Sequence, residues 1–281
     1  MRWTPGDRSN IEDARGRTGG RALPIGIGGF IILLLLSWAT GTDFLSLLNT
    51  DSGPTETGAP GQVQTTPQEE RMVDFVDAVA NDVQDAWGQV LGSRYQRTRI
   101  VLFRDAIESA CGSAESATGP FYCPGDRKVY LDLGFFDELK QRFGAPGDFA
   151  EAYVIAHELG HHVQHLLGLD ESVQRGAAAG PNSASVALEL QADCFAGMWG
   201  HAASESGRFK AGHVELEPGD ADEALRAAAA IGDDRLQKMA TGRVMPDRFT
   251  HGSSAQRVEA FKRGMDSGEL RACGVAVRGA D

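Results

Sequence analysis

Residues 154–165, VIAHELGHHVQH, constrain the fold more than any other part of the chain. They lie in a predicted helix, residues 148–167, whose apolar residues nearly encircle it, so we expect this helix to be buried. The same helix carries imidazoles and a carboxylate, and such groups are costly in a protein interior unless they have partners. The rest of the chain must therefore surround this helix and satisfy its polar side chains.

The segment His157-Glu158-Leu159-Gly160-His161 has the HExxH pattern. Two histidines four residues apart project from the same helix face, where both imidazoles can reach one Zn²⁺. Glu158 lies one step round the helix, where it can hold a water molecule at the metal and take its proton. We therefore predict that His157 and His161 are metal ligands and that Glu158 is the catalytic base.

Two further histidines follow on the same helix. His162 points about 100° away from His161, so it cannot join the same set of ligands. His165 lies four residues beyond His161 and could pair with it, but that register places His162 where the base should stand. We interpret His162 and His165 as structural or supporting residues.

A second predicted helix, residues 185–206, carries the carboxylates that complete the site. Glu189 and Asp193 are four residues apart and share one face of a segment otherwise rich in alanine, glycine and aromatic residues. A catalytic zinc needs a third protein ligand, and we predict that Glu189 supplies it. We predict that Asp193 accepts a hydrogen bond from the free ring nitrogen of a ligand histidine. The alternative is a pair of carboxylates on a solvated face.

HELGH followed by ELQAD resembles the gluzincin metallopeptidases, and the E-x-x-A-D form is similar to that of the HtpX-type membrane zinc proteases. More closely, the chain resembles the bacterial "putative neutral zinc metallopeptidase" family, from MRW and IEDARG near the N-terminus, through HELGHHVQ and ELQADCFAGMW, to FTHGSSAQRVEAFKRG. This similarity covers most of the chain. It implies a zincin-like metallopeptidase with one Zn²⁺ per chain and a polypeptide substrate.

A late motif, THGS at residues 250–253 followed by Arg257, is similar to the TH-P-S-xxx-R pattern of the HtpX-type proteases. The resemblance implies that His251 stabilises the oxyanion that develops on the scissile carbonyl and that Arg257 supports the site. Gly252 replaces the proline of the pattern, which predicts a less rigid loop. Two alternatives remain: an exposed histidine beside a plain helix cap, and Tyr153 as the donor to the oxyanion.

Residues 23–39, LPIGIGGFIILLLLSWA, are the one long apolar run without a charge, and about 17 residues is the lower limit for a membrane-spanning helix. Five arginines precede the run, and no lysine or arginine follows it until Arg71. This bias predicts a cytoplasmic N-terminus, a single pass through the lipid bilayer and a domain outside the cytoplasm. A cleaved signal peptide is the alternative. We predict four segments: a cytoplasmic tail at 1–21, an anchor at 22–40, a flexible linker at 41–67 and the catalytic domain at 68–281.

Cysteine usage and net charge limit the compartment and the partners. Four cysteines permit two disulfides outside the cytoplasm. Cys111 and Cys123 flank a loop of small residues and are expected to pair, which leaves Cys194 to pair with Cys273. The net charge of −12 argues against a nucleic-acid partner.

The periodicity of the remaining chain predicts an α+β fold that is mostly helical and has a small sheet. Short strands are expected at 99–103 and 128–133, and by analogy with zincins the second strand offers an edge to an extended substrate. Small residues in the 185–206 helix, such as Gly197, allow a neighbouring helix to approach closely. Further helices are expected at 68–91, at 134–143, at 148–167 with a capping box of Asp148 and Glu151, at 220–240 and at 253–265.

Together these patterns predict a membrane-anchored zinc endopeptidase that acts outside the cytoplasm. Two alternatives belong to other classes. One is a catalytically silent zinc-bound binding or chaperone module, and the other is a zinc hydrolase of amide bonds in the cell envelope.

Overall fold

The computed structural model describes residues 1–16, 65–115, 119–171, 179–205 and 210–275. The chain divides into two units, one made of residues 1–14 with 65–281 and the other of residues 15–64. Only residues 15 and 16 of the second unit are described. The predicted anchor at 22–40 and most of the predicted linker therefore lie outside the described residues. Every helix in the described part of the chain is too short or too polar to cross a membrane.

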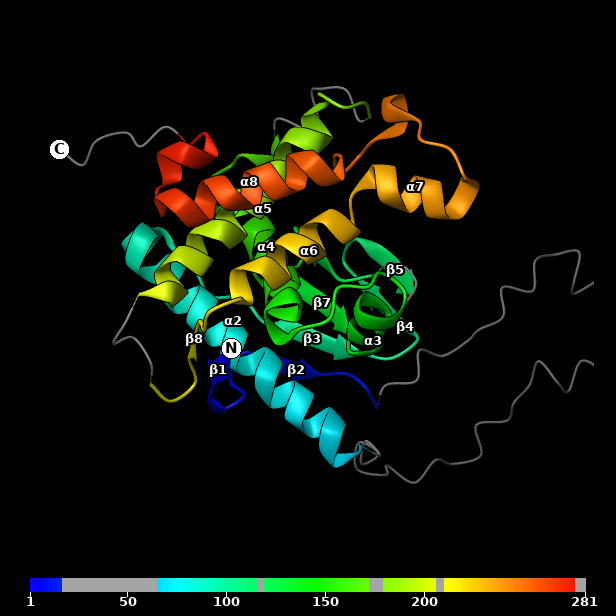
Figure 1. Ribbon diagram of the computed structural model, residues 1–281. Coiled ribbons are helices and arrows are strands. Elements are labelled where there is room, and N and C mark those ends of the chain that lie inside the picture. The colour runs from blue at the N-terminus through cyan, green and yellow to red at the C-terminus, as the bar shows by residue number, and fades with distance from the viewer. Residues whose placement is uncertain (17–64, 116–118, 172–178, 206–209, 276–281) are drawn as a thin grey trace, which may run out of the picture. The chain divides into compact units, whose positions relative to one another are not determined.

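The first unit is a mostly helical α+β structure, as predicted. Its helices are α2 (Pro67–Leu91), α3 (Gly134–Gln141), α4 (Asp148–Leu166), α5 (Ala184–Ser204), α6 (Asp220–Ala230), α7 (Asp233–Thr241) and α8 (Ser254–Ser267). Figure 1 shows α4 inside this arrangement, with α5 and α6 beside it and α8 packed against α5. Every residue from Phe149 to Gly160 except Glu151 is buried, so the prediction of a buried helix around HELGH is confirmed.

The main sheet has four strands in the order β2–β3–β7–β6, with β2 at Ile11–Asp13, β3 at Ile100–Phe103, β7 at Lys128–Asp132 and β6 at Phe121–Cys123. Strand β3 is parallel to β2 and to β7, and β6 is antiparallel to β7. The predicted strand at 128–133 is therefore β7, but it is flanked on both sides, so the prediction that it offers an edge is wrong. Strand β6 is an edge of this sheet among the described residues.

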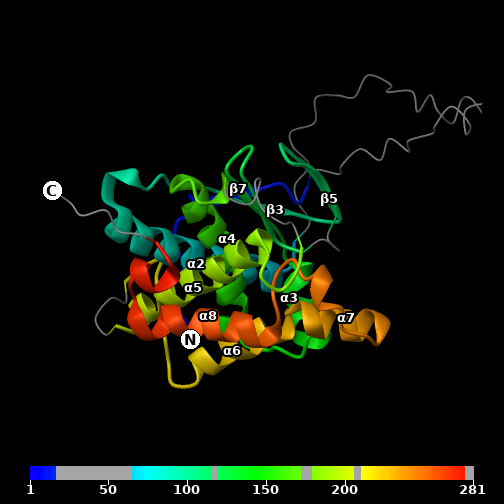
Figure 2. The ribbon, with the colours of Figure 1, turned by 90° about the horizontal axis from the view of Figure 1, so that it is seen from above.

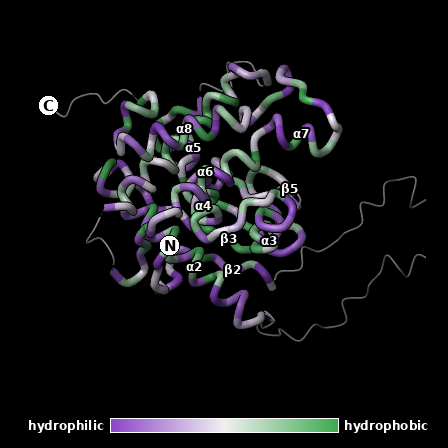
Figure 3. Tube along the Cα trace, viewed as in Figure 1, coloured by the Kyte–Doolittle hydropathy of each residue, from purple (hydrophilic) through white to green (hydrophobic). Residues whose placement is uncertain are grey.

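Two small sheets complete the strands: a hairpin of β4 (Ala106–Ser109) with β5 (Gly112–Glu115), and a pair of β1 (Arg2–Trp3) with β8 (Val214–Glu215). Figure 2 shows the main sheet on one side and α6 and α8 on the other, with α2, α4 and α5 between them. The hydropathy colouring in Figure 3 places the hydrophobic stretches on these inner helices, and hydrophilic stretches at the periphery, as on the first turns of α2.

Glycines allow α5 and α8 to pack almost backbone to backbone. A Cβ on Gly197 would lie 2.1 Å from the carbonyl oxygen of Phe261, and a Cβ on Gly264 would lie 1.9 Å from that of Cys194. The predicted close approach at Gly197 is therefore confirmed. Gly160, within HELGH, makes a less extreme contact with α5, where a Cβ would lie 3.2 Å from the carbonyl oxygen of Ala192. Small residues thus allow α5, the helix that carries ELQAD, to pack closely against α8 and against α4, the helix that carries HELGH.

Two details of the predicted helices are wrong. The expected helix at 220–240 breaks into α6 and α7 at Gly232, where a Cβ would meet the backbone nitrogen of Ser254 at 2.3 Å. The expected capping box at the start of α4 is absent, because Gly147 is the cap and Asp148 is already helical. By contrast, Ser253 caps α8 in a full capping box with Gln256.

Both predicted disulfides are present. Cys111 pairs with Cys123, which ties the β4–β5 hairpin to β6, and Cys194 pairs with Cys273, which ties the end of the described chain to α5. Free cysteines are absent.

The first fourteen residues form an arm that is part of the domain. Strand β1 pairs antiparallel with β8, with Arg2 opposite Glu215, and β2 pairs in parallel with β3, with Ile11 opposite Ile100. The ring of Trp3 packs edge-on against that of Phe75 at 5.6 Å. The arm thus supplies one strand to each of two sheets.

Polar side chains of the arm also form hydrogen bonds and ion pairs with the rest of the domain. Asn10 is buried, donates to Asp77 at 3.2 Å and accepts from Gln84 at 2.9 Å. The Arg8 guanidinium pairs with Glu70 at 2.6 Å and with Asp74 at 2.7 Å. Buried amides and paired charges of this kind require the arm to be present while the domain is folded.

Residues 1–14 of the predicted tail at 1–21 belong to the same compact unit as residues 65–281. A single membrane crossing between residues 14 and 65 would put the arm and the domain on opposite sides of the bilayer. That arrangement is incompatible with the pairing of β1 with β8 and of β2 with β3.

We predict that the variant Arg2→Cys/Glu215→Cys forms a third disulfide in cells, because opposite residues of paired strands lie within the range a disulfide spans. Thiol labelling of the denatured, unreduced full-length chain should find no free thiol in this variant and one in each single variant. The two native disulfides report that the compartment is oxidising. Two labelled thiols beside intact native disulfides would contradict the placement of the arm, and a linked dimer would show that the arm pairs with a second copy.

Candidate metal centre

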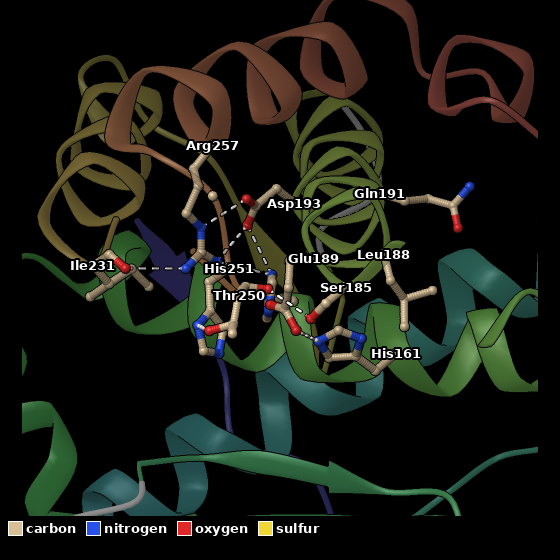
Figure 4. Close-up of polar contacts among 12 residues, drawn as sticks. His161, Ser185, Leu188, Glu189, Gln191, Asp193, Ile231, Thr250, His251 and Arg257 are labelled. Carbon is tan, nitrogen blue, oxygen red and sulfur yellow. Dashed lines mark hydrogen bonds and ion pairs between the residues drawn. The ribbon is translucent and has the colours of Figure 1, made fainter. Parts of the chain in front are cut away.

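Three side chains from α4 and α5 converge on one point. The ligand atoms of His157, His161 and Glu189 all lie within 4.8 Å of one another. The Nε2 atom of His157 is 3.1 Å from one oxygen of Glu189, and Nε2 of His161 is 3.5 Å from the other. Figure 4 shows Glu189 pointing from its helix towards the His161 ring. The structure thus brings together the three residues that the sequence predicted as ligands.

A hydrogen bond at Nδ1 fixes the orientation of each of the two imidazoles. Nδ1 of His157 donates to Asp193 at 2.8 Å, and Nδ1 of His161 donates to the side-chain oxygen of Gln164 at 2.8 Å. With both Nδ1 atoms engaged, both Nε2 atoms are left to face Glu189. Two imidazole nitrogens and one carboxylate are a donor set that suits a catalytic zinc, so the residues present fit that metal.

Asp193 is fully buried and accepts hydrogen bonds from three side chains, those of His157, Arg257 and Tyr153. Arg257 of α8 donates to both of its oxygens, at 2.8 and 2.9 Å, and the hydroxyl of Tyr153 donates to one of them. Arg257 also donates to the Tyr153 oxygen at 3.2 Å. Figure 4 shows Arg257 reaching across to Asp193. This network holds the His157 ring through charged partners.

The same network shifts the pKa values of its members. Burial alone would lower the pKa of His157, but the charge and hydrogen bond of Asp193 raise it to about 10. Burial would raise the pKa of Asp193, and the guanidinium of Arg257 with the His157 ring lowers it to about 2. The carboxylate is therefore ionised at neutral pH.

Glu158 lies next to the ligands and is also buried. Burial raises the pKa of its carboxyl above the ordinary value, against the opposing charges of His157 and His161. A carboxylate with a raised pKa is better matched to taking a proton near neutral pH. Its position is that expected for a base in an HExxH helix.

A cavity of about 760 Å³ opens onto the ligands. His157, Glu158, His161 and Glu189 line it together with His251, residues of β6 such as Tyr122, and apolar residues of α3 and α7. His251 thus faces the same space as the predicted ligands. Its side chain is about half exposed, at 53%.

The loop that carries His251 is held firmly by Asp233, a residue that the sequence did not single out. One Asp233 oxygen accepts from the backbone nitrogens of Thr250, His251 and Gly252 at 2.7, 2.7 and 3.0 Å. Its hydrogen bond to the His251 ring raises the pKa of that histidine. Gly252 has φ +96°, which proline cannot adopt, so the proline of the family pattern would not fit this loop conformation.

Tyr153 was the alternative donor to the oxyanion. Its hydroxyl is fully buried and is engaged by Asp193 and Arg257, which makes it a support of Asp193. Burial raises its pKa well above the ordinary value. Of the two candidates, His251 has the more accessible donor.

The two remaining histidines of α4 point away from the ligands. Buried His162 donates from Nε2 to the carbonyl of Gln96 at 2.6 Å and accepts from the Tyr122 hydroxyl at 3.1 Å. His165 contacts Asp170 at 2.7 Å. Through Tyr122, His162 holds β6 in place beside the cavity. These contacts agree with the interpretation that His162 and His165 are supporting residues.

Comparisons with known proteins identify the class. Residues 1–275 match the family described as "Putative neutral zinc metallopeptidase", and the chain belongs to this family. It is 45% identical over 295 residues to the uncharacterized protein YpfJ of Escherichia coli (strain K12), covering 97% of this chain and 98% of that protein. It is 44% identical over 224 residues to the uncharacterized protein Rv2575 of Mycobacterium tuberculosis, covering 76% of each. No solved structure matches the chain significantly.

We predict that zinc binding near neutral pH releases about one to two protons, because only neutral imidazoles bind the metal and His157 and His161 both have raised pKa values. Affinity should fall as the pH is lowered. In the metal-free chain the His157–Asp193 contact stabilises the fold fully below pH 6.5, and this contribution is lost as the pH rises through about 10. Titration calorimetry in buffers of different ionisation enthalpy measures the protons, and binding without proton release would contradict the assignment.

Proposed function

We propose that the chain is a zinc-dependent endopeptidase that hydrolyses peptide bonds outside the cytoplasm. The observation that carries the proposal is the convergence of His157, His161 and Glu189 in one wall of the cavity, with Glu158 beside them. A purely structural metal site has no use for an additional buried carboxylate next to its ligands. Membership of a family described as zinc metallopeptidases supports the same class of reaction.

His157, His161 and Glu189 would hold one zinc ion, which when bound supplies Lewis-acid polarisation of the carbonyl and lowers the pKa of a water molecule. Glu158 takes the proton from the attacking water and passes it to the leaving amine. His251 donates a hydrogen bond to the developing oxyanion from its loop at the cavity. Asp193, backed by Arg257, keeps the His157 ring in the required orientation.

Strand β6 is the element best placed to bind an extended substrate. Its residues Phe121 and Tyr122 line the cavity, and it is an edge of the main sheet among the described residues. An edge strand pairs with an extended peptide through main-chain hydrogen bonds and leaves alternate side chains to be read by pockets. Phe135, Phe143 and Leu236 on the cavity wall favour apolar side chains there.

The two disulfides support a location outside the cytoplasm, because such bonds persist in oxidising compartments. Attachment to a lipid bilayer through residues 22–40 remains a proposal, since that segment lies outside the described residues. If attachment occurs, the arm at residues 1–14 accompanies the domain in its compartment.

The Glu158→Gln variant of the full-length chain tests the reaction. We expect it to bind one zinc ion per chain and to cleave an unfolded protein substrate about 10²–10⁴-fold more slowly, because the base is lost while the ligands remain. Glu259→Gln, at an exposed position on α8, is the control and should behave as the unaltered chain. Retained cleavage by Glu158→Gln would overturn the mechanism. If the unaltered chain binds one zinc ion but cleaves no peptide, the result favours a catalytically silent zinc-bound module. If it hydrolyses only fragments of the cell envelope, the result favours a zinc hydrolase of envelope amide bonds.

A second variant tests the oxyanion donor. His251→Ala should lower kcat about 10²-fold with little change in zinc affinity, because the histidine contacts substrate and not the metal. His165→Ala, at the far end of α4, should leave kcat close to that of the unaltered chain. Steady-state kinetics with parallel zinc titration measure both effects. An unchanged kcat in His251→Ala would remove this residue from the mechanism.

A further inference from the structure

The two ligand histidines are supported by different chemistry. Behind His157 stands a carboxylate, Asp193, which is itself paired with Arg257. Behind His161 stands an amide, Gln164, which lies three residues further along α4 and is completely buried. Because an amide can both donate and accept, the direction of its hydrogen bonds is decided by its other partners.

Those partners fix the amide of Gln164 in one orientation. Its nitrogen donates to the backbone carbonyl of Leu188 at 2.6 Å, and a carbonyl can only accept. The side-chain oxygen of Gln164 must then face Nδ1 of His161, 2.8 Å away. An oxygen acceptor requires a proton on Nδ1, so a neutral His161 ring keeps its lone pair on Nε2, towards Glu189.

A second amide extends the chain of hydrogen bonds. Gln164 also donates to the side-chain oxygen of Gln191 at 3.1 Å, and the nitrogen of Gln191 donates to the backbone carbonyl of Cys273 at 2.9 Å. Cys273 is held to α5 by its disulfide with Cys194. The terminal carbonyl therefore gives every hydrogen bond in the series the same direction, from His161 towards Cys273.

We propose that Gln164 is the positioning residue for His161, and that Gln191 and the carbonyl of Cys273 hold it in place. The relay selects the ring tautomer in which Nε2 is the metal ligand. The inference rests on the proposed zinc site but adds the residues that shape it. The amide of Gln164 is uncharged, which suits a region that already holds the carboxylates of Glu158, Glu189 and Asp193. A further carboxylate at this position would add to their mutual repulsion.

The first measurement uses the unaltered full-length chain loaded with zinc. Long-range ¹H–¹⁵N spectra of histidine-labelled protein should show the His161 proton on Nδ1 and protected from exchange with solvent. A proton on Nε2 would overturn the proposal without any variant. In the metal-free chain at a pH where the ring is neutral, the same tautomer is expected, so the relay is tested even if the chain proves not to be a peptidase.

Two variants measure the energetic effect. Gln164→Met keeps the length of the side chain but removes both hydrogen-bonding groups, and should weaken zinc binding about 10–100-fold in chelator competition. Gln191→Met leaves the direct partner of His161 in place and should weaken it less. Gln141→Met, on the exposed end of α3, is the matched control and should bind as the unaltered chain does.

The absorption spectrum of the Co²⁺-substituted protein adds a readout of ligand geometry that a loss of packing alone would not change. We expect an altered spectrum for Gln164→Met and an unaltered one for the control. Unchanged zinc affinity and an unchanged Co²⁺ spectrum in a folded Gln164→Met protein would overturn the proposal. If Gln164→Met does not fold, two other results together would overturn the proposal: unchanged zinc affinity in Gln191→Met, and a proton on Nε2 of His161 in the unaltered chain.

Discussion

The buried ion pair between Asp193 and Arg257 is the interaction on which the rest of the site depends. Both residues are almost completely buried, and a buried charge is tolerated only when its partner and its hydrogen bonds are in place. Asp193 lies on α5, Arg257 on α8, and the groups that share the pair, Tyr153 and His157, on α4. Three helices must therefore meet at one point, and the orientation of a ligand histidine follows from that meeting.

Small residues make this meeting possible. Side chains larger than hydrogen at Gly197 or Gly264 would collide with the backbone of the facing helix, so any other residue there would push α8 away from α5. Such a displacement would move Arg257 from Asp193 and leave a buried carboxylate unpaired. Gly160 allows close contact of α4 with α5, where a Cβ would lie 3.2 Å from the carbonyl oxygen of Ala192. The glycines of HELGH and of the 185–206 segment thus contribute to the chemistry by setting helix separation.

The sequence predicted the parts of the site that depend on helical spacing alone. His157 with His161, and Glu189 with Asp193, are pairs four residues apart, and a helix places such pairs on one face whatever surrounds it. The supports that it missed depend on tertiary contacts. Gln164 has its role because the carbonyl of Leu188 orients it, and Asp233 because the loop at 250–252 folds back onto the start of α7. Neither relationship leaves a local pattern.

The arm at residues 1–14 is a second case in which tertiary contacts leave no local sequence pattern. Its strands have two and three residues and pair with segments about 90 to 210 positions away, so periodicity could not reveal them. The arginines before the apolar run were read as a flanking charge that fixes membrane orientation. In the structure, Arg2 pairs with Glu215 and Arg8 pairs with Glu70 and Asp74. The charges of these two arginines are therefore neutralised within the folded domain and help to hold the arm against it.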